Sequence, residues 1–268
     1  MKVRLNSAIF KALGFAFVAI LTCFASDAGR ERPADSSDQA EQATAPATPE
    51  PEFTFVRAVY TSLRPWGYYK GWYTDWPKAD RQFLLGLQRL TNIRVAREGK
   101  TIALTDPELF RYPFLYSVEV GQWDLSDEEV SSLGEYLRRG GFLFCDDFWG
   151  SIEWANFERN IRRVLPECRI EELSRDHPLF HAYYDINEII QTPNVGNAVE
   201  RRPTYEQDGF IPHCRGISDD SGRLMVVINW NTDLGDAWEW ADLPGYPARY
   251  STYAYQVGIN AIVYAMSH

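Results

Sequence analysis

The sequence GGFLFCDDFWG, from Gly140 to Gly150, decides the fold that we expect for this chain. A helical pattern precedes it and stops at Gly140, because glycine tolerates the left-handed conformation that ends many helices. The apolar run Phe142–Cys145 that follows predicts a buried strand. Asp146 and Asp147 therefore stand at the carboxyl end of a strand, and this is the edge of an open α/β sheet at which ligands bind.

Strand and helix patterns alternate on both sides of this stretch. Apolar runs predict strands at residues 53–61, 94–105, 114–120, 142–145 and 169–173, with helices between them. Parallel strands joined by right-handed helical crossovers are the expected topology. The turn signal at 219–222 predicts an antiparallel hairpin between 210–217 and 223–230, and a closing helix is expected at 253–266. The predicted fold is a three-layer α/β sandwich with a mostly parallel, twisted sheet.

Several helix starts are indicated by local signals. Pro77 suits a first helical turn, and Asp106 is expected to cap a short helix that follows it. Ser126 and Glu129 have the spacing of a capping box. Ser151 is expected to cap the helix after the central strand.

The first 52 residues differ in composition from the rest of the chain. Positive charges at residues 1–11 precede an apolar run at 12–25, which is shorter than the ~20 residues needed to span a bilayer. We interpret residues 1–25 as a signal peptide that is cleaved after Ala25. The alternative is a lipoprotein signal with Cys23 as the modified residue, although Thr22 fits poorly before it. Residues 26–52 contain no aromatic residue and predict a disordered linker, which leaves 53–268 as the folded domain.

The chain is acidic. Its formal net charge is −10, and removal of Lys2, Arg4 and Lys11 with the signal peptide would bring this to −13. Such a surface repels nucleic acid and anionic lipid, so we expect no nucleic-acid partner and membrane attachment only through an N-terminal lipid anchor. The protein is expected to be exported, in the periplasm or associated with the cell envelope, where a carbohydrate or an envelope protein would be its partner.

Three cysteines remain after loss of the signal peptide, an odd number in a compartment that permits disulfides. Cys168 and Cys214 could form a pair. Cys145 lies in an apolar strand, where a thiol usually packs as a small core residue.

Several strings together resemble the bacterial family described as domain of unknown function 4159, DUF4159. They are TDWP at 74–77, LTDPELFRYPFLY at 104–116, GGFLFCDDFWG at 140–150, HPLF at 177–180, LGDAWEW at 234–240 and GINAIVYAMSH at 258–268. The resemblance covers essentially all of 53–268. It implies a divergent class I glutamine amidotransferase-like fold with a flavodoxin-like sheet, similar in layout to trehalose-utilisation-type domains. The activity of that family is unassigned, so the resemblance informs the fold more than the function.

An active class I amidotransferase carries its nucleophilic cysteine on a tight Gly-x-Cys-x-Gly elbow between a strand and a helix. This chain departs from that pattern, because Cys145 is followed by Asp146 and Asp147. Two adjacent carboxylates would also raise the pKa of the thiol and suppress the thiolate. Glutaminase activity is therefore not expected. The leading hypothesis is a non-catalytic ligand-binding or scaffold domain, and whether it has another enzymatic activity stays open.

Asp146 and Asp147 have a structural and a functional interpretation. In the first, one of them caps a helix or pairs with an arginine. In the second, both converge with Asp75 and Asp106 on one crevice, where the carboxylates bind a divalent cation or act as general acid and base. No other cofactor is expected.

Residues 65–76 form an aromatic loop after the first predicted strand. Aromatic rings beside carboxylates commonly bind sugars, although simple packing of the loop onto the sheet explains the same composition. The alternative hypothesis is therefore a carboxylate-dependent enzyme or a lectin-like module that acts on a cell-envelope carbohydrate. The candidate ligand-binding residues are Asp75, Trp76, Asp106, Asp146, Asp147, Trp149, Trp72 and Tyr73.

A second acidic series follows the predicted hairpin. Asp233, Asp236, Glu239 and Asp242 recur at every third position, which on a helix would place them along one flank. We expect that flank to be a solvated face, because the series does not have the spacing of an EF-hand calcium loop.

Overall fold

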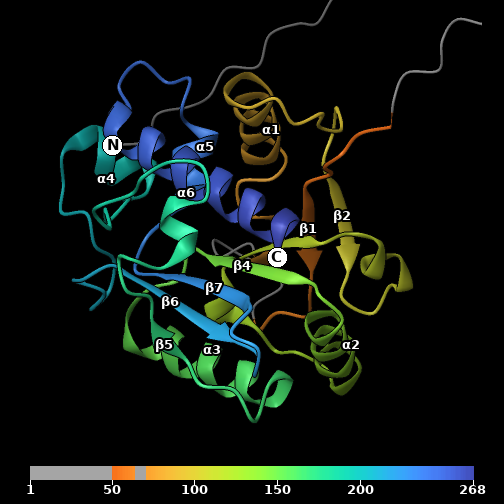
Figure 1. Cartoon of the computed structure of the whole chain (residues 1–268). Coiled ribbons are helices and arrows are strands. Elements are labelled where there is room, and N and C mark those ends of the chain that lie inside the picture. The colour runs from red at the N-terminus through yellow and green to blue at the C-terminus, as the bar shows by residue number, and fades with distance from the viewer. Residues whose placement is uncertain (1–49, 64–70) are drawn as a thin grey trace, which may run out of the picture. The chain divides into compact units, whose positions relative to one another are not determined.

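The computed structural model describes residues 50–63 and 71–268, and a seven-stranded sheet runs through the centre of this domain (Figure 1). The strand order is β2-β1-β3-β4-β7-β6-β5. The strands are β1 (Val56–Val59), β2 (Lys100–Ala103), β3 (Phe114–Val118), β4 (Phe142–Asp146), β5 (Glu171–Glu172), β6 (His213–Ser218) and β7 (Leu224–Trp230). Strands β2, β1, β3, β4 and β7 are parallel to one another, whereas β6 is antiparallel to both β7 and β5. The expected mostly parallel sheet with an antiparallel hairpin is confirmed, but the strand expected at 169–173 among the parallel strands is the short edge strand β5, which is antiparallel to β6.

Helices cover both faces of this sheet. Three of them, α1 (Lys78–Leu90), α5 (Leu234–Glu239) and α6 (Ala248–Ser267), pack together on one face, and α2 (Asp127–Arg138) and α3 (Gly150–Val164) lie on the other (Figure 1). The connections contain α4 (Val195–Glu200) and the 3-10 helices η1 (Gly71–Tyr73), η2 (Pro107–Arg111), η3 (Val120–Gln122) and η4 (Pro178–His181). The described domain is thus an α/β sandwich of three layers.

The central strand β4 contributes to two hydrophobic cores. Phe142 and Phe144 pack into the core on the side of α1 and α6, whereas Leu143 and Cys145 pack into the core on the side of α2 and α3. Side chains of a strand point alternately to its two faces, and both faces of this sheet are covered. Every residue of β4 is therefore buried, and the strand reads as a continuous apolar run.

Three of the four predicted helix starts are confirmed, and the cap at Ser151 is wrong. The helix expected near Pro77 is α1, which begins at the next residue, Lys78. The Asp106 side chain accepts a hydrogen bond from the Glu108 amide at the start of η2, and Ser126 and Glu129 form the reciprocal capping box of α2. Ser151 does not cap α3, because that helix begins at Gly150. The Trp149 amide instead donates to the Glu153 carboxylate at 2.6 Å.

Cys145, Cys168 and Cys214 are all free thiols, so the proposed pair of Cys168 and Cys214 is not formed. No helix within residues 50–63 and 71–268 combines the length and apolarity needed to cross a bilayer. The expected signal peptide and nearly all of the expected linker lie outside the described residues, as do Trp66, Tyr68 and Tyr69 of the aromatic loop.

Candidate functional site

A crevice of about 740 Å³ opens beyond the carboxyl ends of the parallel strands. Its walls come from the segments that follow β1, β3, β4 and β7, and from the start of α4. The eight acidic side chains that line it are Asp75, Glu119, Asp147, Glu153, Glu206, Asp233, Asp236 and Glu239. No lysine, arginine or histidine is among the described residues of this lining. The described lining of the crevice is therefore strongly acidic.

Three of these acids stand at sharp turns of the backbone. Glu119 directly follows β3 and Asp147 directly follows β4, with φ angles of 54° and 51°, and Asp75 in the turn before α1 has a φ of 61°. Left-handed backbone is uncommon for residues other than glycine, although aspartate tolerates it better than most. Such conformations concentrate at functional sites, where the surrounding structure holds them.

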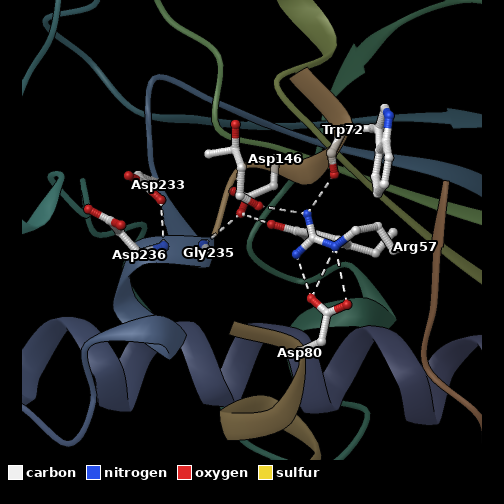
Figure 2. A network of polar contacts seen from close by, with 9 residues as sticks. Arg57, Trp72, Asp80, Asp146, Asp233, Gly235 and Asp236 are labelled. Carbon is white, nitrogen blue, oxygen red and sulfur yellow. Dashed lines mark hydrogen bonds and ion pairs between the residues drawn. The ribbon is translucent and has the colours of Figure 1, made fainter. Parts of the chain in front are cut away.

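The buried Arg57 of β1 fixes the loop that presents Asp75. Its Nε donates to both carboxylate oxygens of Asp80 in α1, at 3.1 and 3.2 Å (Figure 2). Its Nη1 donates to the carbonyl oxygens of Trp72 and Thr74, at 3.0 and 2.9 Å. One guanidinium thus ties the sheet, the helix and the loop together at the residues immediately before Asp75.

Asp146 is fully buried and does not line the crevice. Its Oδ1 accepts a hydrogen bond from the Leu234 amide, and its Oδ2 accepts one from the Tyr116 hydroxyl at 3.0 Å. Its Oδ2 also accepts from the Gly235 amide at 2.9 Å (Figure 2). Burial raises the pKa of Asp146 to about 7, although these hydrogen bonds oppose the shift. The structural interpretation applies to Asp146, but the helix that it anchors is α5 and not α3.

The acidic flank of α5 lies in the crevice wall, so the expectation of a solvated face is wrong for its first members. Asp233 and Asp236 are only 4% and 7% exposed. Asp233 Oδ1 accepts a hydrogen bond from the Asp236 amide at 2.7 Å and caps the helix (Figure 2). The Asp236 carboxylate accepts from the indole of Trp240 and from the Val195 amide. The flank is buried because α5 packs against α1 and α6.

Burial and mutual repulsion raise the pKa values of three crevice acids, Asp75, Asp147 and Asp233. Burial is the largest cause for Asp75, Asp147 and Asp233, whose pKa values lie well above the ordinary range. The next cause is in each case a neighbouring carboxylate: Asp236 acts on Asp75, Glu119 acts on Asp147, and Asp147 acts on Asp233. A group of strongly shifted carboxyls in one crevice is typical of a functional site.

The crevice brings together four of the eight candidate residues. Asp75, Trp76, Asp147 and Trp149 line it. Trp149 is only 3% exposed and donates its indole N–H to Asp147 Oδ1 at 3.0 Å, so it supports that carboxylate. Trp76 is 48% exposed, the most exposed of the four aromatic candidates, and its ring centroid lies 6.2 Å from that of Trp72.

The other four candidates are not part of the crevice lining. Asp146 lies behind it, and Asp106 is an exposed cap of η2, so these two do not join the convergent carboxylates. Trp72 and Tyr73 contact one another with their rings 5.4 Å apart, which fits the packing interpretation of the aromatic loop.

Six of the lining acids were not among the candidates. Glu119 falls inside the predicted strand 114–120, whereas β3 ends at Val118 and leaves Glu119 just beyond the strand. Asp233 follows shortly after β7, so the rule that ligands bind beyond strand ends could have identified it. Glu206 lies in a connection with no such signal.

Cys145 cannot act as a nucleophile in this crevice. It lies inside β4, is fully buried, and faces the core on the side of α2 and α3. Burial, with a contribution from Asp146, raises the pKa of its thiol well above the ordinary value. The chemistry available to the crevice is therefore that of its carboxylates: cation binding or proton transfer.

A family model described as "Domain of unknown function (DUF4159)" matches residues 54–266. The match covers nearly the whole described domain. No curated protein sequence matches the chain.

Proposed function

Because the chain belongs to the DUF4159 family, whose description assigns no activity, we propose its function from the chemistry of the crevice. The domain is a binding module, and the crevice holds a positively charged ligand. One observation carries this proposal: eight acidic side chains line the crevice, and none of its described lining residues is basic.

The size of the crevice favours a small-molecule ligand. A volume of about 740 Å³ lies within the range of about 300–1,000 Å³ that is usual for such sites. A positive ligand would offset the repulsion that raises the pKa values of Asp75, Asp147 and Asp233. The acidic walls would repel phosphate and carboxylate ligands, because a cleft lined by charges of one sign concentrates the electrostatic potential inside it.

Charge selectivity can be tested with matched sugars by isothermal titration calorimetry at pH 6.5, where the amine of glucosamine is protonated. We expect glucosamine to bind at least about tenfold more tightly than uncharged N-acetylglucosamine, a difference of about 1.4 kcal/mol, and glucuronate not to bind. Binding of glucosamine should weaken as salt increases. Equal affinities for the charged and uncharged sugars would contradict the proposal.

The thiol of Cys145 is expected to play no part in this function. Cys145→Ala should leave the affinity for glucosamine unchanged within about twofold and should lower the free energy of unfolding by about 1 kcal/mol, the usual scale of a small core change. Titration calorimetry and urea unfolding measure the two effects. A glutamine-hydrolysing activity that is present in the wild-type protein and lost in Cys145→Ala would contradict the exclusion of thiol catalysis.

A second candidate function is recognition of, or carboxylate-dependent action on, an uncharged carbohydrate. It is favoured by Trp76, whose half-exposed ring lines the crevice next to Asp75. Flat apolar sugar faces pack on such rings while hydroxyls bind carboxylates. Tight binding of N-acetylglucosamine that is lost in Trp76→Ala would support this candidate in place of charge recognition.

We place this function outside the cytoplasm. The support is the positively charged segment 1–11 followed by the apolar run 12–25, together with the linker composition of 26–52. An envelope carbohydrate or envelope protein is then the expected partner. We also assign the fold to the class I glutamine amidotransferase-like group. The parallel order β2-β1-β3-β4-β7 supports this assignment, because it corresponds to the order of flavodoxin-like sheets.

A further inference from the structure

Three carboxylates from three different loops meet in the crevice. Asp75, Asp147 and Asp233 each offer one oxygen, and these oxygens all lie within 4.8 Å of one another. Two oxygens that are each about 2.4 Å from a Ca²⁺ ion can be at most about 4.8 Å apart. The spacing of the three side chains therefore suits ligation of a single cation.

Among the described residues, no basic side chain lines the crevice around these carboxylates. Asp75 Oδ2 is shielded from solvent and accepts no hydrogen bond from the described residues. Asp147 and Asp233 are only 7% and 4% exposed, and in the described part of the chain hydrogen bonds reach each of them through Oδ1 alone. A buried carboxylate oxygen without a partner is costly, so this arrangement indicates a group that the protein itself does not supply.

The buried Arg57 does not fill this role, although its charge opposes the rise in the pKa of Asp75. Its hydrogen bonds go to Asp80 and to the carbonyls of Trp72 and Thr74 (Figure 2). Its charge is neutralised by Asp80, which is itself buried.

We propose that Asp75, Asp147 and Asp233 bind a hard divalent cation, with Ca²⁺ as the best fit. This inference rests on the proposed function and specifies it, because it identifies the positively charged ligand of the crevice as a metal ion. A set of carboxylate oxygens suits Ca²⁺, Mg²⁺ or Mn²⁺, whereas zinc sites favour nitrogen and sulfur ligands. Three protein ligands leave coordination positions open toward the crevice, where water or the hydroxyls of a ligand complete the shell.

The surrounding groups hold these ligands in place. The Trp149 indole orients the Asp147 carboxylate, and the Asp236 amide orients that of Asp233. Partners of this kind fix the ligands of known metal sites. A second set, Asp75 with Asp236 and Glu239, has similar spacing, but both Asp236 oxygens already accept hydrogen bonds. The first set is therefore the better site.

The indole of Trp149 allows a direct test with the full chain. Tb³⁺, which replaces Ca²⁺ at oxygen sites, should show saturable luminescence on excitation of tryptophan, and Ca²⁺ should displace it. Asp147→Asn and Asp233→Asn should each weaken Ca²⁺ binding by at least about tenfold. Asp242→Asn is the matched control, because Asp242 belongs to the same acidic series, is exposed, and does not line the crevice. It should change the affinity by less than about twofold.

Both variants are designed to fold. Asparagine tolerates the left-handed backbone at position 147 and caps helices as well as aspartate does at position 233, and near-ultraviolet circular dichroism checks the result. Absence of saturable Tb³⁺ or Ca²⁺ binding at millimolar concentration would overturn the cation site, as would an equal loss in Asp242→Asn, which would indicate diffuse counterion binding. If metals fail to bind while glucosamine binds, the cation site is wrong and the proposed function stands.

Discussion

Replacing Asp80 by alanine is expected to lower the free energy of unfolding by about 3–5 kcal/mol, because it leaves the Arg57 guanidinium charged, buried and without its counterion. Arg57 has no exposed surface and Asp80 is 3% exposed, so water cannot replace the lost carboxylate. Many domains are stable by only about 5–15 kcal/mol, and the loss would therefore be a large fraction of the total. Urea unfolding followed by tryptophan fluorescence measures it.

The ion pair of Arg81 and Glu98 provides the control for this prediction. Arg81 lies on the same helix as Asp80, and the two side chains of the pair are 61% and 65% exposed. Exposed pairs contribute about 0–1 kcal/mol, so Glu98→Ala should have a small effect. Similar losses in Asp80→Ala and Glu98→Ala would show that burial does not set the strength of the Arg57 interaction.

The sequence predicts the central part of this fold because the relevant signals are local. The glycine at 140, the apolar run of β4 and the paired Asp146 and Asp147 are contiguous, so the strand and its carboxyl end can be placed without tertiary information. The capping box of Ser126 and Glu129 is predicted equally well, since its bonds span three residues.

The parts of the site that the sequence does not predict depend on strand order and packing. Asp106 follows a strand just as Asp147 does, but β2 is the edge strand of the sheet, and its loop does not reach the crevice. Alternation of strands and helices does not reveal which strand is central. The three-residue periodicity of the acids in and around α5 predicts a solvated face. In the structure α5 packs on α1 and α6, and its N-cap Asp233 is buried.

Arg57 illustrates the same limit within a single strand. An arginine in an apolar run usually indicates an exposed position, because charged side chains are rarely fully buried unless they are paired. Its partner Asp80 is 23 residues away, on a helix whose contact with β1 cannot be derived from spacing. The sequence pattern therefore does not indicate that Arg57 fixes the Asp75 loop.

Asp233→Asn is expected to stabilise the metal-free domain at pH 8, by about 1–2 kcal/mol, the scale of substitutions that relieve a functional site. Burial and the neighbouring Asp147 and Asp236 raise the pKa of Asp233 well above its ordinary value. As the pH rises above about 4, the unfolded chain loses this proton while the folded protein retains it, so stability falls with increasing pH. The asparagine side chain does not titrate, and its carbonyl oxygen can still accept the hydrogen bond from the Asp236 amide that caps α5.

The size of this gain should depend on pH in a defined way. At pH 4 the carboxyl is protonated in the folded state and about half protonated in the unfolded chain, so the free energies of unfolding of the variant and the wild type should differ by only about 0.5 kcal/mol. The difference should grow as the pH is raised to 8. Urea unfolding in EDTA at both pH values measures it. A stability loss of the same size at both values would show that Asp233 acts only as a cap.

Calcium should reverse the order of the two proteins. An ion that binds only the folded state at about 100 times its dissociation constant adds about 2.7 kcal/mol to the free energy of unfolding. The wild type has all three proposed ligands and should gain this stability, whereas Asp233→Asn should gain little. The wild type would then be less stable than Asp233→Asn in EDTA and more stable than it in calcium. This reversal would show that the crevice keeps its mutually repelling carboxylates close together because a cation binds between them.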